Sequence, residues 1–239
     1  MKICKITSPN SSKIRRKINE IRYLIIHYTG MQSKRASIKR LIDKKQKVSC
    51  HYLIDRSGGV TQMVDESLIA WHAGKSKWKN LKNLNKNSIG IELVNKGHHL
   101  RYEKFTNKQI NQLIKLCLIL KKKYKIKKDC VLGHSDIAPL RKKDPGEKFP
   151  WQKLSKKGLC FSYFTGNKNN TINYSEKKIR NLFFNNLHKI GYRYFSKSRQ
   201  SKKEKLVIKA FQRRFIQSKI DGKIDQKTLK ISHYLASKT

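Results

Sequence analysis

Residues 133–146 read Gly-His-Ser-Asp-Ile-Ala-Pro-Leu-Arg-Lys-Lys-Asp-Pro-Gly, and the rest of the chain is organised around them. This stretch offers the imidazole of His134 and, ten positions later, the carboxylate of Asp144. A second imidazole, His27, follows the apolar run Tyr-Leu-Ile-Ile at residues 23–26. Two histidines and one aspartate supply three protein ligands, which leave the fourth position of a tetrahedral zinc ion for water, as in catalytic sites. The pattern therefore predicts a catalytic metal site.

Four separated segments carry a resemblance to a known family. They are Ile25–Thr29, Ser88–Leu93, Leu132–Asp136 and Lys142–Gly146. In this order and at these spacings they resemble the zinc-dependent N-acetylmuramoyl-L-alanine amidases of the AmpD and AmiD type, over residues 20 to 155 or so. The resemblance implies a hydrolase that cuts the amide bond between N-acetylmuramic acid and L-alanine. Its substrate would be peptidoglycan or anhydro-muropeptide fragments, in cell-wall turnover and recycling.

The resemblance also implies a role for each residue of the site. One Zn²⁺ per chain would be held by His27, His134 and Asp144. Glu92 would accept a proton from the attacking water and pass it to the departing amine, and Lys142 would stabilise the developing oxyanion. The residues themselves support a function for Glu92, because a carboxylate inside an apolar strand is costly without a partner. Three substrate contacts are implied as well: Trp71, His72 and Asn95.

Several of these residues have plainer interpretations. A lone histidine at a strand end is more often packed or hydrogen-bonded than a ligand. Trp71 is equally compatible with core packing, Glu92 with a buried salt bridge and Lys142 with one more surface lysine. His51 is a further candidate ligand, but it begins a strand that similar amidases use structurally. The combination of the motifs, more than any one residue, favours the catalytic interpretation.

The net charge of +42 is extreme, and of the 57 basic residues 13 are arginine and 44 are lysine. Clustered lysine and arginine would indicate nucleic-acid binding, because they neutralise phosphates. Here the basic residues are spread along the whole sequence, which favours a compositional bias over a nucleic-acid-binding protein. We therefore expect no specific nucleic-acid partner, although so positive a surface attracts polyanions, including anionic cell-wall polymers.

The five cysteines are an odd number without Cys-x-x-Cys spacing, which argues against a disulfide framework and against a structural zinc site. No stretch of the sequence reaches the length and apolarity of a membrane span. Residues 1–6 lack the apolar core of a secretory signal, so the chain is expected to be either cytoplasmic or shown without its leader. The wall-binding resemblance described below favours the periplasmic side of the cell envelope.

The catalytic region, residues 21–160, is expected to form an α/β domain with a mixed central β-sheet flanked by helices. Residues 22–28 form a short segment around the apolar run 23–26, as in a central strand covered on both faces. Residues 51–64 carry a hairpin signature around two glycines, and residues 88–94 form another apolar strand. A capping box opens a helix at Thr106.

The remaining segments differ in composition. Residues 1–20 are polar and basic and predict a loosely ordered lead-in, and residues 161–172 predict a linker. Residues 173–239 contain three helical segments, the second opened by Ser201 and the third by Asp225. Three pieces of this region resemble the small three-helix peptidoglycan-binding domain that commonly follows such hydrolases: Leu187–Tyr192, Ala210–Phe215 and Asp221–Asp225.

Both resemblances name peptidoglycan or muropeptides as the partner, and we expect a monomer. The competing class is a catalytically inactive recognition module, as in relatives that have lost a ligand. This chain retains the three ligands together with Glu92 and Lys142, which favours an enzyme. The C-terminal region, residues 173–239, offers no set of ligands at metal-site spacing, so we expect it to bind polymer without cutting it.

Overall fold

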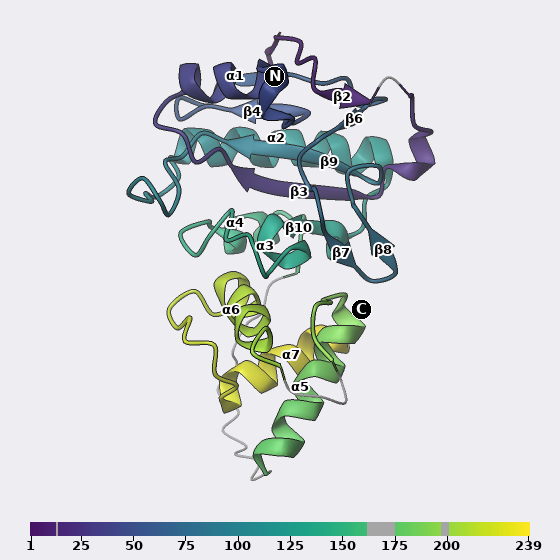
Figure 1. Cartoon of the computed structure of the whole chain (residues 1–239), viewed down its shortest axis with the longest axis vertical. Coiled ribbons are helices and arrows are strands. Elements are labelled where there is room, and N and C mark those ends of the chain that lie inside the picture. Colours follow the sequence, from purple (N-terminus) through teal and green to yellow (C-terminus); the bar gives the residue numbers. More distant parts are fainter. Residues whose placement is uncertain (13, 162–174, 197–200) are drawn as a thin grey trace.

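A computed structural model describes residues 1–12, 14–161, 175–196 and 201–239. Figure 1 shows an α/β part, built around one sheet, with a group of C-terminal helices packed below it. The predicted fold class, a mixed sheet flanked by helices and followed by further helices, is confirmed. The predicted linker, residues 161–172, lies outside the described residues except for Phe161.

Six strands form the central sheet. They are β1 (Ile3–Lys5), β3 (Tyr23–Tyr28), β4 (Tyr52–Ile54), β5 (Val60–Gln62), β9 (Ser88–Leu93) and β10 (Val131–Gly133). Their order across the sheet is β1-β5-β4-β9-β3-β10. All neighbours are parallel except β4 and β5, which form the predicted antiparallel hairpin.

The parallel centre of the sheet positions the functional residues. Leu24, Ile25 and Ile26 of β3 are fully buried, as expected for a strand covered on both faces. Strand β3 lies between β9 and β10, so the carboxyl ends of these three strands meet at one edge. His27 lies near the end of β3, and His134 follows β10 directly. Side chains far apart in the sequence therefore converge on a rigid scaffold.

Helices cover the sheet. They are α1 (Lys34–Ile42), α2 (Asn107–Tyr124), α3 (His134–Ile137) and α4 (Trp151–Lys156). Thr106 caps α2 as predicted, because its hydroxyl oxygen accepts the Gln109 backbone N–H at 3.1 Å. The Gln109 side chain does not complete the predicted capping box. It donates instead to the carbonyls of Ile54 and Val94, at 3.0 and 3.2 Å, and so fastens α2 to the sheet.

Smaller elements complete the α/β part. Two-stranded sheets pair β2 (Ser11–Ser12) with β6 (Ile69–Ala70) and β7 (Lys77–Trp78) with β8 (Leu81–Lys82). Short 3₁₀ turns cover Ile18–Glu20, Lys44–Gln46 and Lys128–Cys130. All five cysteines are free thiols, and four of them are buried. In the part of the chain that the structure describes, the helices are too short or too polar to cross a membrane.

Residues 1–20 are more structured than the sequence predicts. Strand β1 pairs with β5 and forms an edge of the central sheet. Arg16 is buried, and its guanidinium donates to the backbone carbonyls of Glu66 and Ser88, at 3.0 and 2.6 Å. These partners are main-chain oxygens, so no pattern of residue types marks them in the sequence. The segment described as a lead-in is therefore part of the α/β fold.

Three helices form the C-terminal part: α5 (Glu176–Ile190), α6 (Glu204–Phe215) and α7 (Gln226–Ala236). Phe183 of α5 and Phe211 of α6 are fully buried, with ring centroids 5.4 Å apart and ring planes perpendicular. Asp225 caps α7 as predicted, accepting the Thr228 backbone N–H at 2.8 Å. Helix α6 begins later than predicted, at Glu204, because Ser201 accepts hydrogen bonds in a turn before the helix.

The C-terminal helices pack against the α/β part, and one continuous hydrophobic core contains apolar residues of both. The Trp78 and Tyr192 rings meet at 4.9 Å, edge to face. The Lys79 backbone N–H donates to the Gly191 carbonyl at 2.8 Å, and the Gln217 amide donates to the Phe149 carbonyl at 2.7 Å. Figure 1 shows α6 lying directly against the region of α3 and α4.

Candidate active site

Three side chains converge at the carboxyl ends of β3 and β10. His27 Nδ1 is 2.9 Å from His134 Nδ1 and 3.0 Å from Asp144 Oδ2. Asp144 Oδ2 is also 3.0 Å from His134 Nδ1. All three residues are buried, and their ligand atoms lie close enough together to hold one ion. The structure thus brings together the three predicted ligands, which come from a strand, a helix start and a loop.

The protonation states of this cluster suit a metal cation. Burial, and then the neighbouring His134, lower the pKa of His27 to about 4, so its imidazole is neutral at pH 7. Burial alone would raise the pKa of Asp144, but its interactions with His134 and His27 outweigh burial and hold this pKa well below its usual range. Neutral imidazole and ionised carboxylate are the forms that bind metals.

The spacing of the donor atoms also fits zinc. Tetrahedral Zn²⁺ with bonds of about 2.0–2.1 Å places its ligand atoms about 3.3 Å apart. The three donor atoms are separated by 2.9 to 3.0 Å, so small outward shifts satisfy this geometry. Two imidazole nitrogens and one carboxylate oxygen form a common donor set for a catalytic zinc. The residues present therefore fit the implied metal.

A chain of hydrogen bonds fixes the orientation of both histidine ligands. His27 Nε2 is 3.0 Å from His72 Nδ1, and His72 Nε2 is 3.3 Å from the Ser88 hydroxyl, which donates to the Leu84 carbonyl at 2.6 Å. With Nδ1 of His27 facing the cluster, each N–H or O–H along this chain has an acceptor. His134 Nε2 similarly meets the Ala73 carbonyl at 3.1 Å. Such partners set the tautomer and ring orientation of metal ligands.

Glu92 lies beside the cluster. In the register of β9 and β3 it is directly opposite His27, so the two side chains leave the sheet on the same face. Burial, and then the charge of Asp144, raise the pKa of Glu92 to about 8. Its buried Oε2 has no hydrogen-bond partner within the described part of the chain. A carboxylate left unpaired at such a position indicates a group that is kept for chemistry.

A groove opens over these residues. It forms a cavity of about 540 Å³, within the range of small-molecule sites. His134, Glu92 and Asp144 line it together with four basic side chains: Arg40, Arg141, Lys142 and Lys143. Arg141 is committed to the protein, because its guanidinium donates to the carbonyls of Ala73 and Lys75. The Lys142 ammonium has no ion pair or hydrogen bond among the described residues, so it can meet an anion in the groove.

The comparisons with known proteins agree with this geometry. The family described as N-acetylmuramoyl-L-alanine amidase matches residues 17–147, more than half of the chain. The chain belongs to this family. The chain is 42% identical to the N-acetylmuramoyl-L-alanine amidase AmiD of Escherichia coli in an alignment of 151 positions that covers 58% of this chain and 54% of AmiD. The aligned segment thus spans about half of that curated relative.

Solved structures cover more of the chain. The complex of E. coli AmiD with the substrate anhydro-N-acetylmuramic acid-L-Ala-D-gamma-Glu-L-Lys has a TM-score of 0.80 and 31% identity, over 95% of this chain and 92% of that chain. The structure of AmpDh3 from Pseudomonas aeruginosa in complex with anhydromuramic pentapeptide has a TM-score of 0.81 and 29% identity, over 95% and 94% of the two chains. The predicted family is therefore confirmed, and the similarity of fold extends to the C-terminal helices.

The three residues predicted to contact substrate lie in different surroundings. His72 lines the groove, but both of its ring nitrogens are used, one towards His27 and one towards Ser88. Asn95 is buried, and its side chain donates to the Glu103 carbonyl at 2.9 Å and accepts from Gly97, so it shapes a loop of the protein. Trp71 is half-buried and lies outside the residues that line the groove. The side chains of His72 and Asn95 thus have partners within the protein, and contact of these residues with substrate stays a prediction.

His51, the other candidate ligand, is also accounted for by the fold. Its Nδ1 accepts the Gly90 backbone N–H at 3.0 Å, and its Nε2 lies 2.8 Å from the Arg16 guanidinium. Burial, and then the charge of Arg16, lower the pKa of His51 to about 3. His51 is therefore a neutral structural residue and does not join the cluster of His27.

Two further residues at the groove were assigned no role from the sequence. Tyr28 and His98 line it, with the Tyr28 hydroxyl 2.8 Å from His98 Nδ1. His98 Nε2 is 3.1 Å from Glu147 Oε2, and its ring stacks on Tyr102 at 4.4 Å. The aromatic residue directly after His27 was a signal for the first of these positions. The second lies in a loop whose course depends on the folded protein.

Gly90 has no side chain, and the His72 ring lies where a side chain would be. Replacing Gly90 therefore tests whether the hydrogen bonds from His27 through His72 to Ser88 support the metal site. A Cβ atom added at Gly90 would lie 2.3 Å from Cγ of the His72 ring. We expect Gly90→Ala to displace this ring and weaken zinc binding by about 10–100-fold, the usual effect of losing a partner of a metal ligand. Zinc affinity would be measured by competition with a chromophoric chelator.

Gly158→Ala is the matched control for this prediction. The added Cβ would meet only the Lys128 side chain, at 3.9 Å, although the positive φ of Gly158 makes the change mildly destabilising. We expect zinc affinity within about twofold of the wild type in this variant. Equal affinities in Gly90→Ala and Gly158→Ala would show that His72 does not support His27.

Proposed function

We propose that this amidase hydrolyses the amide bond between N-acetylmuramic acid and L-alanine, in peptidoglycan or its anhydro-muropeptide fragments, with one Zn²⁺ per chain. The observation that carries the proposal is the buried convergence of His27, His134 and Asp144 beside the unpaired Glu92, at the base of an open groove. The named ligands of the similar AmiD and AmpDh3 structures support this substrate class.

An amide is a poor electrophile with a poor leaving group, so the site must supply three things. Zinc, when bound, supplies a Lewis acid that polarises the carbonyl and lowers the pKa of water to about 7. Glu92, ionised beside a bound cation, accepts the proton of the attacking water and returns a proton to the departing amine. His72 and Ala73 hold the two imidazoles in place throughout.

The basic wall of the groove supplies the third requirement. Lys142 lies there without a protein partner among the described residues, so its ammonium can stabilise the oxyanion that develops on the carbonyl. A fixed cation is worth more in a partly enclosed groove than in bulk water. The other cations of the wall, Arg40 and Lys143, face a ligand that carries carboxylates, as the stem peptide does.

Cleavage of defined substrates tests the proposal. The full chain with zinc would be incubated with soluble anhydro-muropeptide and, separately, with intact sacculi, and the released L-alanine amino groups would be counted. We expect hydrolysis of at least one substrate, and the ratio of the two rates reports whether fragments or intact wall are preferred. A zinc-loaded chain that cleaves neither would refute the proposed activity.

The C-terminal helices are proposed to hold the polymer. The support is the resemblance of this region to a wall-binding domain, and its arrangement as three helices. A weak binding module raises the local substrate concentration, so its benefit should grow with substrate size. We expect removal of the residues after 165 to cost more activity on sacculi than on soluble muropeptide. Equal losses on both would leave the helices with a structural role alone.

The same region supports a proposal for the compartment. We propose the periplasmic side of the cell envelope, because a wall-binding region has its target there, and cytoplasmic recycling of muropeptides is the alternative. Fractionation of the producing cells, followed by detection of the chain, distinguishes the two. Recovery with the cytoplasmic markers would reject the envelope.

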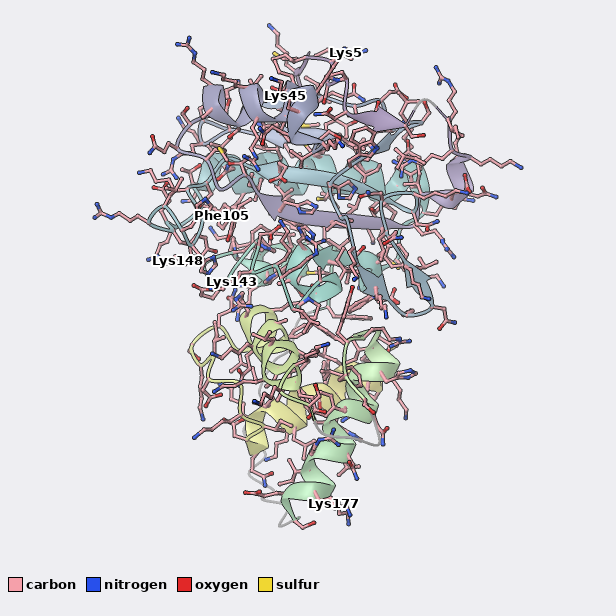
Figure 2. The ribbon with its side chains drawn as sticks, in the orientation of Figure 1. Lys5, Lys45, Phe105, Lys143, Lys148 and Lys177 are labelled. Atoms are coloured by element: carbon pink, nitrogen blue, oxygen red, sulfur yellow. The ribbon has the colours of Figure 1, made fainter. Side chains whose placement is uncertain are left out.

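The charge of the amidase makes a separate prediction about DNA. Figure 2 shows Lys5 at the top of the molecule, Lys148 at its side and Lys177 at its lower end, in keeping with positive charge spread over the whole surface. We expect DNA to bind only at low salt and to compete poorly with sacculi at physiological ionic strength, where the Debye length is about 8 Å. Tight, sequence-selective DNA binding at that salt concentration would contradict a purely compositional origin of the charge.

A further inference from the structure

Asp136 is a buried carboxylate two residues after the ligand His134, and it is held from three sides. Its Oδ2 accepts the Gly133 backbone N–H at 2.7 Å. Its Oδ1 accepts the hydroxyl of Tyr192 at 2.6 Å, and Arg214 forms an ion pair with it. Only 1% of Asp136 is exposed. The predicted catalytic chemistry uses none of these four residues.

Two of the three partners come from the C-terminal helices. Arg214 belongs to α6, and Tyr192 follows α5. A second guanidinium nitrogen of Arg214 donates to the Val131 carbonyl at 2.8 Å, and the guanidinium lies over the Trp151 ring at 4.2 Å. Val131 begins β10, the strand that leads into His134. Arg214 therefore contacts the backbone before the ligand and the carboxylate after it.

The helical turn that carries His134 is not stable by itself. Helix α3 has four residues, and its closing bond runs from the Ala138 N–H to the His134 carbonyl, at 2.9 Å. A single helical turn is unstable in isolation, because it fixes several dihedral angles for one hydrogen bond. The turn also positions the third ligand, since the Ser135 N–H donates to the Asp144 carbonyl at 2.9 Å. Contacts from outside must supply the remaining stability.

The ion pair between Arg214 and Asp136 is energetically important for the conformation of the turn that carries His134. A buried charge that loses its partner is strongly unfavourable, even where the intact pair contributes little net stability. Without Arg214, the Asp136 carboxylate would have to turn towards water or rearrange its remaining bonds. Either change releases the Gly133 N–H, which lies immediately before His134.

We infer that Arg214 and Tyr192 are positioning residues, which fix His134 and Asp144 in their metal-binding arrangement through Asp136. This inference rests on the proposed zinc site. The C-terminal helices then have a second role besides wall binding, because they complete the scaffold of the metal ligands. Metal affinity and activity on small, soluble substrates should depend on these helices too.

The experiment compares point variants of the full chain. Arg214→Met removes the charge, Arg214→Lys restores it in part, and Tyr192→Phe removes one hydroxyl while keeping the ring. We expect zinc affinity, measured by chelator competition, to fall by about 10–100-fold in Arg214→Met and by less in the other two. Free energies of unfolding would be measured in parallel by denaturant titration.

Arg180→Met is the matched control. Arg180 forms an equivalent ion pair with Glu204, but that pair lies wholly within the C-terminal helices. Its loss should lower stability and leave zinc affinity within about twofold of the wild type. If Arg214→Met and Tyr192→Phe also stay within twofold, the residues merely stabilise the fold and the inference is overturned.

A metal-free measurement separates this inference from the proposed function. Hydrogen exchange of the Gly133 and Ser135 amides reports the turn directly, and we expect it to be at least about tenfold faster in Arg214→Met than in Arg180→Met. If the wild-type chain binds no zinc, the proposed function fails, and the exchange rates still decide whether Arg214 holds the turn. Unchanged exchange at both amides would overturn the positioning role.

Discussion

Glu92→Gln should retain one zinc per chain and lose about 10²–10⁴-fold in turnover, the usual contribution of a positioned acid–base group. The amide matches the size of the carboxyl group but accepts no proton from water. The change therefore removes the acid–base function and preserves the packing. Glu92 stands opposite His27 without contributing to the ligand cluster, which is why the metal should stay bound. Steady-state kinetics on soluble muropeptide, together with metal analysis, provide the measurement.

Glu103→Gln is a suitable control for this variant. Glu103 pairs with Arg56 at 2.9 Å, on the surface and outside the groove. Its replacement should leave turnover within about twofold of the wild type. Full activity of Glu92→Gln would remove the acid–base role from Glu92 and leave the reaction without an identified base.

The same variant should show a pH-dependent gain in stability in the metal-free chain. Burial, and then Asp144, raise the pKa of Glu92 from 4.5 to about 8. Between these values the unfolded chain is ionised at this position while the folded chain holds the proton, so stability falls as the pH rises. Glutamine carries no such proton. The stability of Glu92→Gln relative to the wild type should therefore increase from pH 4.5 to 8, as denaturant unfolding would show.

The sequence predicted the elements and ligands whose signals are local. The apolar run before His27 and the one that contains Glu92 are central strands because each is long, apolar and buried on both faces. The ligand set was predictable because His134 and Asp144 lie ten residues apart in one distinctive stretch, and because His27 follows an apolar run in a second segment that resembles the same family. Such features can be recognised in a single sequence, because each is a pattern among residues that are close together along the chain.

Long-range partners were beyond prediction for a physical reason. Arg16 binds main-chain carbonyls, which every residue possesses, so nothing in the sequence distinguishes it from the other basic residues. Arg214 is equally inconspicuous until Asp136 is seen beside it. Asn95 looked like a groove residue, but its amide is used to shape a loop. In a chain with 57 basic side chains, function can be assigned to one of them only from its contacts.

Asp144→Ala should have the largest effect on the metal. Asp144 is the one anion of the ligand set, so its loss leaves only the two imidazoles, which carry no negative charge, to bind a divalent cation. Losing a partner of a ligand costs about 10–100-fold in affinity, and losing the ligand itself should cost more than about 100-fold. Purified wild-type chain should contain one zinc, and the variant should contain little.

Stability provides an independent measure of the same loss. A ligand that binds only the folded state stabilises it by about 2.7 kcal/mol when present at 100 times its Kd. Zinc at such a concentration should raise the unfolding midpoint of the wild type and leave that of Asp144→Ala unchanged. Asp65→Ala serves as the control, because Asp65 accepts a hydrogen bond from Ser67 in a surface turn and should not affect the metal.

A chelator should abolish activity in the wild type, and added zinc should restore it. Fully active protein that contains no zinc would disprove the metal assignment and, with it, the assigned roles of His27 and His134.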